Sequence, residues 1–310
     1  MIDFVFLGLV IFAAVYWLAA FASVVLYRRR RPCTLDVAPS VTMLKPLRGN
    51  DGQLYENLRS FCLQDYRSFE IVFGVRDVHD PAVAVVERLS HEFLGLELKL
   101  VADSRTIGTN LKVSNLANLV RHAKYDTLIV ADSDMRVGPG YVRAVVGPLE
   151  DRRVGLVTYL YRGVAPYGVA YRLGAMFINE WFLPAALVGT HVERLRHAFG
   201  ATIACRRDTL RSIGGFEAVA DQLADDYMLG WLVSGRGLRA VGRLVLYRSL
   251  GQPPPWSATR LVPIRDIVSF VVGILSFLGR TVRWDDEQFR VRRDGRLERR
   301  VETGNRQRLA

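Results

Sequence analysis

The first feature of the chain is a nearly unbroken apolar run at residues 4–26. A helix needs about 20 such residues to cross the hydrocarbon core of a bilayer, so the run predicts a membrane anchor over residues 1–27. A cleaved signal peptide is the alternative, but the run is too long, its charges follow it, and no small-residue cleavage site comes next. Arginines 28–31 place the following segment on the cytoplasmic side by the positive-inside rule. We assign residues 28–40 to a basic juxtamembrane linker.

From residue 41 the pattern changes to short apolar runs that alternate with stretches of helical periodicity. This alternation predicts βαβ units and an α/β fold with a mainly parallel sheet and helices on both faces. We assign residues 41–250 to this single domain. The expected strands are 41–44, 70–75, 96–101, 127–131 and 154–161, and the expected helices are 54–63, 82–93 and 112–121.

The later part of the chain is less regular. Residues 167–188 are aromatic and aliphatic with few charges, which fits either a core helix or a surface that contacts a membrane. Residues 221–232 carry acidic side chains in their first turns and predict a helix. The apolar stretch 261–278 is interrupted by two charges near its start, and what remains is too short to span a bilayer easily. We therefore assign residues 251–310 to a C-terminal membrane-associated helix and a basic tail.

Composition and charge narrow the class of partner. The chain has 310 residues, 50% of them hydrophobic, and a formal net charge of +11 that arginine carries almost alone. A basic protein can bind nucleic acid, an anionic lipid surface or a phosphorylated substrate. The arginine clusters lie beside the apolar runs, and no recognition helix or aromatic-basic pattern accompanies them. We expect membrane and phosphate partners and no nucleic acid.

The sharpest chemical signal is the pair Asp132 and Asp134, which follows the apolar strand expected at 127–131. Mg²⁺ prefers one or two carboxylates together with substrate phosphate oxygens, and a metal held there neutralises charge on a diphosphate leaving group. The alternative is a loop with two solvated aspartates. Asp77 ends another expected strand, and ligands of parallel sheets bind beyond the carboxyl ends of the strands, which favours the metal site.

A second acidic pair, Asp225 and Asp226, begins the helix expected near residue 221. A carboxylate there can act as the general base that accepts a proton from an acceptor hydroxyl. Acidic residues in the first turn also stabilise a helix through its dipole. The residues alone leave both interpretations open.

Taken together and in order, these segments resemble the ceramide glucosyltransferase family, glycosyltransferase family 21, which includes bacterial hopanoid-associated glycosyltransferases. The resemblance extends from the first helix to about residue 246 and resumes over residues 261–297. The segments that carry it are 45–49, 69–81 (with Gly74 to Asp77), 108–116, Asp132 to Asp134, Gly214 to Phe216 and Asp225 to Tyr227.

The resemblance implies a Rossmann-like GT-A fold and a role for each acid. Asp77 would hold the nucleotide, Asp132 and Asp134 the metal-diphosphate, and Asp226 would be the base with Asp225 beside it.

By the same resemblance, Lys112 and Arg48 would help to hold phosphate. The implied reaction is an inverting, metal-dependent transfer of glucose or N-acetylglucosamine from a UDP-sugar to a lipid hydroxyl of ceramide or a hopanoid. The metal would be Mg or Mn. The implied location is the inner (cytoplasmic) membrane, with a single N-terminal span and the catalytic domain on the cytoplasmic side.

One part of the family pattern is missing. The family carries a Q/R-x-x-R-W motif some tens of residues after the base, whereas here the chain passes from Tyr247 almost directly to Leu261. The sequence from Arg280 to Trp284 matches the pattern, but its continuation resembles the end of the family's chain, and we interpret it as an interfacial Arg/Trp cluster. The alternative function is therefore an internally shortened relative that binds the donor but is catalytically impaired.

Overall fold

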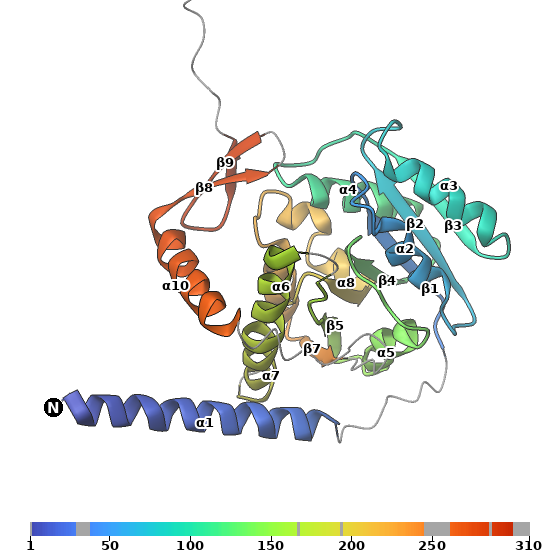
Figure 1. Ribbon diagram of the computed structural model, residues 1–310. Coiled ribbons are helices and arrows are strands. Elements are labelled where there is room, and N and C mark those ends of the chain that lie inside the picture. The colour runs from blue at the N-terminus through green and yellow to red at the C-terminus, as the bar shows by residue number, and fades with distance from the viewer. Residues whose placement is uncertain are drawn as a thin grey trace, which may run out of the picture.

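The computed structural model describes residues 2–28, 38–165, 168–192, 195–244, 261–284 and 287–299. Most of the linker expected at 28–40, the segment 245–260 in which the shortening was inferred, and the end of the basic tail lie outside the described residues. The centre of the molecule is a twisted sheet covered by helices on both faces, with a small second sheet at one end (Figure 1).

The central sheet has seven strands in the order β3-β2-β1-β4-β6-β5-β7. Four of its six neighbouring pairs are parallel, and only β6 runs antiparallel to its neighbours β4 and β5. The predicted α/β fold with a mainly parallel sheet is confirmed. The strands are β1 (Val41–Pro46), β2 (Phe69–Val75), β3 (Glu97–Ala102), β4 (Thr127–Ala131), β5 (Val154–Leu160), β6 (Thr202–Arg206) and β7 (Arg239–Leu244).

The central strands are buried on both faces because their alternate residues enter two separate cores. In β4, Ile129 packs in the core beneath α2, α3 and α5, whereas Leu128 and Val130 pack in the core beneath α4, α8 and α9. This two-sided burial explains why the strand sequences are continuously apolar rather than alternating. The helices are α2 (Leu54–Cys62), α3 (Ala82–Glu92), α4 (Leu111–Leu119), α5 (Tyr141–Val146), α8 (Arg207–Ser212) and α9 (Asp225–Gly235), with short turns η1 (Val120–His122), η2 (Gly147–Glu150) and η4 (Phe216–Val219).

Three further helical segments carry exposed apolar surface. They are α1 (Ile2–Arg28), the continuous α6 (Gly168–Phe177), η3 (Ile178–Phe182) and α7 (Leu183–Val192), and α10 (Val262–Leu278). Helix α1 contacts α7, and α10 contacts α6 (Figure 1). Among the described residues, Gly168–Thr190 is the helix long and apolar enough to cross a membrane, and α1 contains a shorter apolar stretch, Val10–Ser23. The single N-terminal span stays a prediction.

The first part of the basic segment after α10 has regular structure, which the sequence did not predict. It forms an antiparallel sheet of β8 (Thr281–Trp284), β9 (Glu287–Val291) and β10 (Leu297–Arg299), in which Phe289 and Leu297 are buried. The literal motif match at residues 280–284 therefore lies largely in strand β8. The sheet packs against the loop before α9, and this contact explains a second difference. Helix α9 begins at Asp225 rather than at residue 221, because Gln222 pairs with Arg296 instead of entering the helix.

Candidate active site

The predicted metal-binding pair lies at the carboxyl end of β4, as the sequence indicated. Asp132 follows the last strand residue directly, and its backbone N–H donates to the carbonyl of Ala201 at 3.2 Å. The Lys112 ammonium, on the first turn of α4, lies 2.6 Å from the Asp132 carboxylate. Lys112, which the sequence predicted to bind phosphate, therefore forms an ion pair with Asp132, which it predicted to bind the metal.

Lys45 is a site residue to which the sequence assigned no role. Its side chain is completely buried in β1, and its ammonium donates to the Asp132 carbonyl at 2.6 Å and lies 3.6 Å from the centre of the Phe61 ring. Burial lowers the pKa of Lys45 to about 7, although Asp132 and Asp134 oppose this shift. The sequence offered one signal for this role, a lysine at the end of a largely apolar strand. Its contact shows that Lys45 holds the backbone of the aspartate loop.

The lowered pKa predicts a pH-dependent stability for the Lys45→Met variant. Between pH 7 and 10.5 the unfolded chain binds a proton at Lys45 that the folded protein does not, so the Lys45 contribution to the free energy of unfolding rises with pH. The stability of wild type relative to Lys45→Met should therefore increase as pH rises through this window. Urea unfolding of both detergent-solubilised proteins at several pH values measures this difference in the free energy of unfolding. A difference that does not change with pH would contradict the lowered pKa of Lys45.

The second acidic pair lies close to the first. Lys112 is mostly buried, which lowers its pKa, but the charges of Asp132, Asp225 and Asp226 outweigh burial and raise it overall. The backbone of Gly200 leaves room for Asp226, since a β-carbon on Gly200 would stand 2.9 Å from its carboxylate oxygen. Lys112 on α4, Asp132 and Asp134 after β4, and Asp225 and Asp226 at the start of α9 thus form one charged cluster.

Two carboxyls of this cluster are held in surroundings that disfavour their charge. Burial raises the pKa of Asp225, while Lys112 opposes the shift. Desolvation at the strand end, followed by repulsion from Asp132, raises the pKa of Asp134 even though its side chain keeps access to solvent. A cation bound between Asp132 and Asp134 would relieve the repulsion between these two carboxylates.

The carboxylates of the site fit a divalent metal whose remaining ligands come from a substrate and water. In the part of the chain that the structure describes, no group of three or more His, Cys, Asp and Glu side chains is arranged to hold a metal alone. Mg²⁺ commonly takes only one or two protein carboxylates and completes its shell with water and phosphate oxygens. Asp132 and Asp134 provide that partial set.

The other two predicted ligand-binding residues lie on the same edge of the sheet but outside the charged cluster. Asp77 follows β2, two strands from β4, and its exposed carboxylate accepts from the His79 N–H at 2.9 Å. Arg48 is exposed in the loop after β1. That loop is tied to the loop after β2 by the Gly49 N–H, which donates to Asp80 at 2.9 Å. Asp77 therefore lies on the same edge of the sheet as Asp132 but two strands away from it.

A row of aromatic rings borders the charged cluster, and sequence reasoning missed it. The rings of Tyr161, Phe182, Phe199, His197 and Tyr227 follow one another with centroid separations of 5.6, 5.6, 5.5 and 5.4 Å. Burial raises the pKa of Tyr161, and the nearby charges of Asp134, Asp132 and Asp226 add to the shift. The row joins the residue after β5, the η3 turn, the loop before β6 and helix α9. These parts are distant in sequence, so no local pattern predicts the row.

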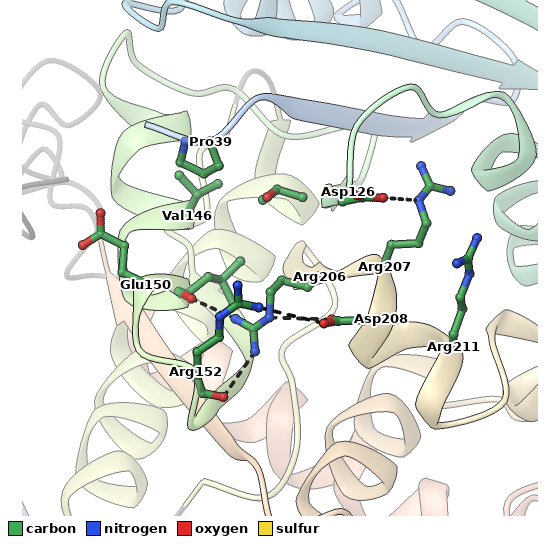
Figure 2. A pocket seen from close by; sticks show the side chains of 11 residues that line it. Pro39, Asp126, Val146, Glu150, Arg152, Arg206, Arg207, Asp208 and Arg211 are labelled. Atoms are coloured by element: carbon green, nitrogen blue, oxygen red, sulfur yellow. Dashed lines mark hydrogen bonds and ion pairs between the residues drawn. The ribbon is translucent and has the colours of Figure 1, made fainter. Parts of the chain in front are cut away.

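A cavity of about 540 Å³ lies at the opposite edge of the sheet and is not this site (Figure 2). It borders Thr127, where β4 begins, whereas the aspartate pair follows the end of that strand. Arg206 and Arg207 line it, but their guanidinium groups donate to backbone carbonyls of neighbouring loops. These arginines stabilise loops and do not form a phosphate site.

Comparison with known proteins gives a consistent assignment. A model described as Glycosyl transferase family 21 matches residues 5–249. The chain is 28% identical over 203 residues to ceramide glucosyltransferase 1 of Caenorhabditis elegans, covering 65% of this chain and 43% of that protein. It is 26% identical over 247 residues to ceramide glucosyltransferase 3 of the same organism, covering 79% and 50%. The chain thus spans about half the length of these curated relatives.

Among solved structures, the fold is similar to that of a mannosyltransferase from Pyrobaculum calidifontis solved in complex with GDP-Man and Mn²⁺. The TM-score is 0.53 with 21% sequence identity, and the match covers 81% of this chain and 70% of that chain. The likeness confirms the expected GT-A fold.

Proposed function

Because the chain belongs to glycosyl transferase family 21, we propose that it is an inverting, metal-dependent glycosyltransferase. The proposed donor is a UDP-sugar carrying glucose or N-acetylglucosamine, and the proposed acceptor is a hydroxyl group of a membrane lipid, ceramide or a hopanoid. One observation carries the proposal: three separate parts of the chain, the loop after β4 with Asp132, helix α4 with Lys112 and the start of α9 with Asp225 and Asp226, meet in one charged cluster.

The donor half of the proposed site uses the strand-end residues. Asp132 and Asp134 would hold a divalent metal, Mg or Mn, which when bound neutralises charge on the diphosphate. Lys112 lies on the Asp132 carboxylate and is placed to contact a phosphate oxygen as well. Lys45 keeps the loop in position through the Asp132 carbonyl. Asp77 would bind the nucleoside end, and Arg48 would add positive charge beside it.

The transfer half uses Asp226 as base. In the proposed reaction the acceptor oxygen attacks the anomeric carbon as its proton passes to the Asp226 carboxylate. The bond between that carbon and the diphosphate breaks, and UDP leaves from the opposite face, which inverts the configuration. Asp226 suits this role because it is only half-buried and accessible to a substrate. The buried Asp225 beside it accepts from the Asn110 amide at 3.4 Å and helps to fix the start of α9.

The exposed helices support a lipid as the acceptor. Phe12 and Phe21 on α1, Trp181 on η3, and Ile267 and Phe270 on α10 are each more than half exposed. Contiguous apolar surface of this kind marks interaction with a membrane or another apolar partner. The aromatic row that borders Asp226 includes η3, so the proposed lipid-facing surface reaches the proposed base. We place the catalytic domain at the cytoplasmic face of the inner membrane.

A second candidate function keeps donor binding without efficient transfer. It is supported by the sequence between β7 and α10, residues 245–261, which contains no Q/R-x-x-R-W segment, and by the place of residues 281–284 in strand β8. In that case, inserting a Q/R-x-x-R-W segment between residues 247 and 261 should rescue transfer. The absence of rescue would count against this candidate.

Activity of purified membranes tests the main proposal. Membranes that contain the protein should transfer sugar from one member of a UDP-sugar panel to a lipid alcohol, and a chelator should abolish the transfer. Membranes from cells without the protein are the control. Transfer that continues in chelator would contradict metal dependence. Metal-dependent UDP-sugar binding without any lipid product would favour the second candidate.

A further inference from the structure

The loop that leads into the proposed base is a shared element of two sheets. Residues 221–223 run beside the β9–β10 turn and form one isolated antiparallel β-bridge with it, between Gln222 and Arg296. The Leu297 N–H donates to the Asp221 carbonyl at 2.8 Å, the Leu223 N–H donates to the Gly295 carbonyl at 3.1 Å, and Gln222 pairs with Arg296 between them. The C-terminal sheet is therefore hydrogen-bonded to a segment that ends two residues before Asp225.

The other side of the same loop contacts the N-terminus of α4, which carries Lys112. The Asn110 N–H donates to the Ala220 carbonyl at 2.8 Å, and its fully buried side-chain amide donates to the Gln222 carbonyl at 2.9 Å. Thr109 donates to the Asp221 carboxylate and, at 3.4 Å, to the Leu297 carbonyl. Residues 220–223 are thus clamped between α4 and β10.

The start of α9 lacks a side-chain N-cap, so the loop before it contributes to its position. Ala224 occupies the N-cap position and cannot provide the side-chain hydrogen bond that usually satisfies the first backbone N–H groups of a helix. The two acidic residues of the first turn also repel each other and lie near Asp132. The direction in which Asp226 points is therefore set largely by the loop before it.

From these contacts we propose that Gly295 and Leu297 are positioning residues for the transfer step. Through residues 221–223 they fix the Asp225 and Asp226 carboxylates relative to Lys112 and the aspartate loop. The proposal rests on the proposed function for the roles of these groups. It gives the basic C-terminal segment a place in the active site's architecture, in addition to its connection to the apolar helix α10.

The upstream end of the same segment is also attached to the site. Arg265, buried near the start of α10, forms an ion pair with Glu180 on η3, the helical turn whose Phe182 belongs to the aromatic row. Because Arg265 is buried, loss of its partner would leave an unpaired charge inside the protein, so the ion pair helps to hold α10 against η3. The segment from α10 to β10 therefore contacts both the helical turn that carries Phe182 and the loop before the proposed base.

Two substitutions disturb the clamp by different physical routes. Gly295 has a φ of 81°, which a branched side chain rarely adopts, so Gly295→Val strains the turn. Leu297→Pro removes the N–H that donates to Asp221. Arg293→Ala is the matched control, because Arg293 is exposed at the same turn.

The full-length proteins in detergent should be compared by amide hydrogen exchange and by steady-state kinetics. In both variants, exchange at residues 223–228 should accelerate about 10-fold or more while α4 stays protected. The kcat should fall about 10-fold to 100-fold, as expected for a misplaced catalytic group, with the KM for the UDP-sugar within about twofold of wild type because the aspartate loop and Lys112 remain in place. Arg293→Ala should match wild type.

Two results would overturn the positioning role. One is accelerated exchange at residues 223–228 with an unchanged kcat. The other is a rise in KM for the donor in proportion to the loss of kcat, which would indicate general unfolding of the site. If exchange at residues 223–228 does not change in either variant, the clamp itself is wrong. Should the wild-type protein bind UDP-sugar but transfer nothing, the proposed function fails, while the exchange experiment still decides whether the clamp exists.

Discussion

Replacing Asp226 with asparagine should abolish sugar transfer while leaving the affinity for UDP nearly unchanged. Asparagine keeps the size of the side chain and its place against Gly200 but cannot accept the proton of the acceptor hydroxyl. Loss of a general base typically costs about 100-fold to 10,000-fold in rate, so kcat should fall by that amount. Product formation from UDP-sugar and lipid measures the rate, and nucleotide binding measured directly gives the affinity.

The matched control is Asp208→Asn, an identical chemical change at an exposed carboxylate that lines the cavity at the opposite edge of the sheet. This variant should transfer sugar at the wild-type rate. If Asp226→Asn does the same, the assignment of Asp226 as base is wrong. A large loss of UDP affinity in Asp226→Asn would instead place this carboxylate in the donor site.

Replacing Asp132 with asparagine should act on donor binding instead of on the proton transfer. The variant loses one metal-binding carboxylate and the ion pair to Lys112, which lies 2.6 Å away. A metal bridge to a diphosphate is worth several kcal/mol, which corresponds to an affinity loss on the order of 100-fold or more. Titration of UDP with Mg²⁺ or Mn²⁺, with and without a chelator, measures this loss.

The control for this variant is Asp126→Asn at the other end of β4, where the carboxylate is 89% exposed and pairs with Arg207. It should bind metal and UDP as wild type does. Equal UDP affinity of Asp132→Asn and wild type in the presence of metal would remove Asp132 from the donor site. A metal effect that persists in Asp132→Asn would point to other ligands.

Several elements were predictable because their signals are local. The strand at 127–131 was located to the residue, since a threonine and four apolar residues end abruptly at an aspartate, a run too short for a buried helix. The helix of α10 was recognised from its apolar run, and its bounds differ by one residue from the expected ones. The order of motifs was sufficient to identify the family, which the matching family model confirms.

Other expectations were wrong or left open because the deciding contacts are distant in sequence. Acidic residues from Asp221 onward imitate the first turn of a helix, but Asp221 accepts from Thr109, which is 112 residues away. The sheet of the basic tail was not predicted, because the charge pattern gives no sign that Phe289 and Leu297 are buried in it. The apolar residues 168–190 form a helix, and their composition is compatible both with a core and with a membrane.

The amino-acid sequence by itself determined that carboxylates would lie at one edge of a parallel sheet, because such strands end at the same edge and Asp77 and Asp132 each follow one. Only the tertiary structure decided which charges meet there. Lys45 reaches the Asp132 carbonyl across 87 residues, and Lys112 pairs with the Asp132 carboxylate. Local patterns specify the ends of strands and helices, whereas the position of the loop before Asp226 depends on the packing of β10, which lies more than 70 residues further along the chain.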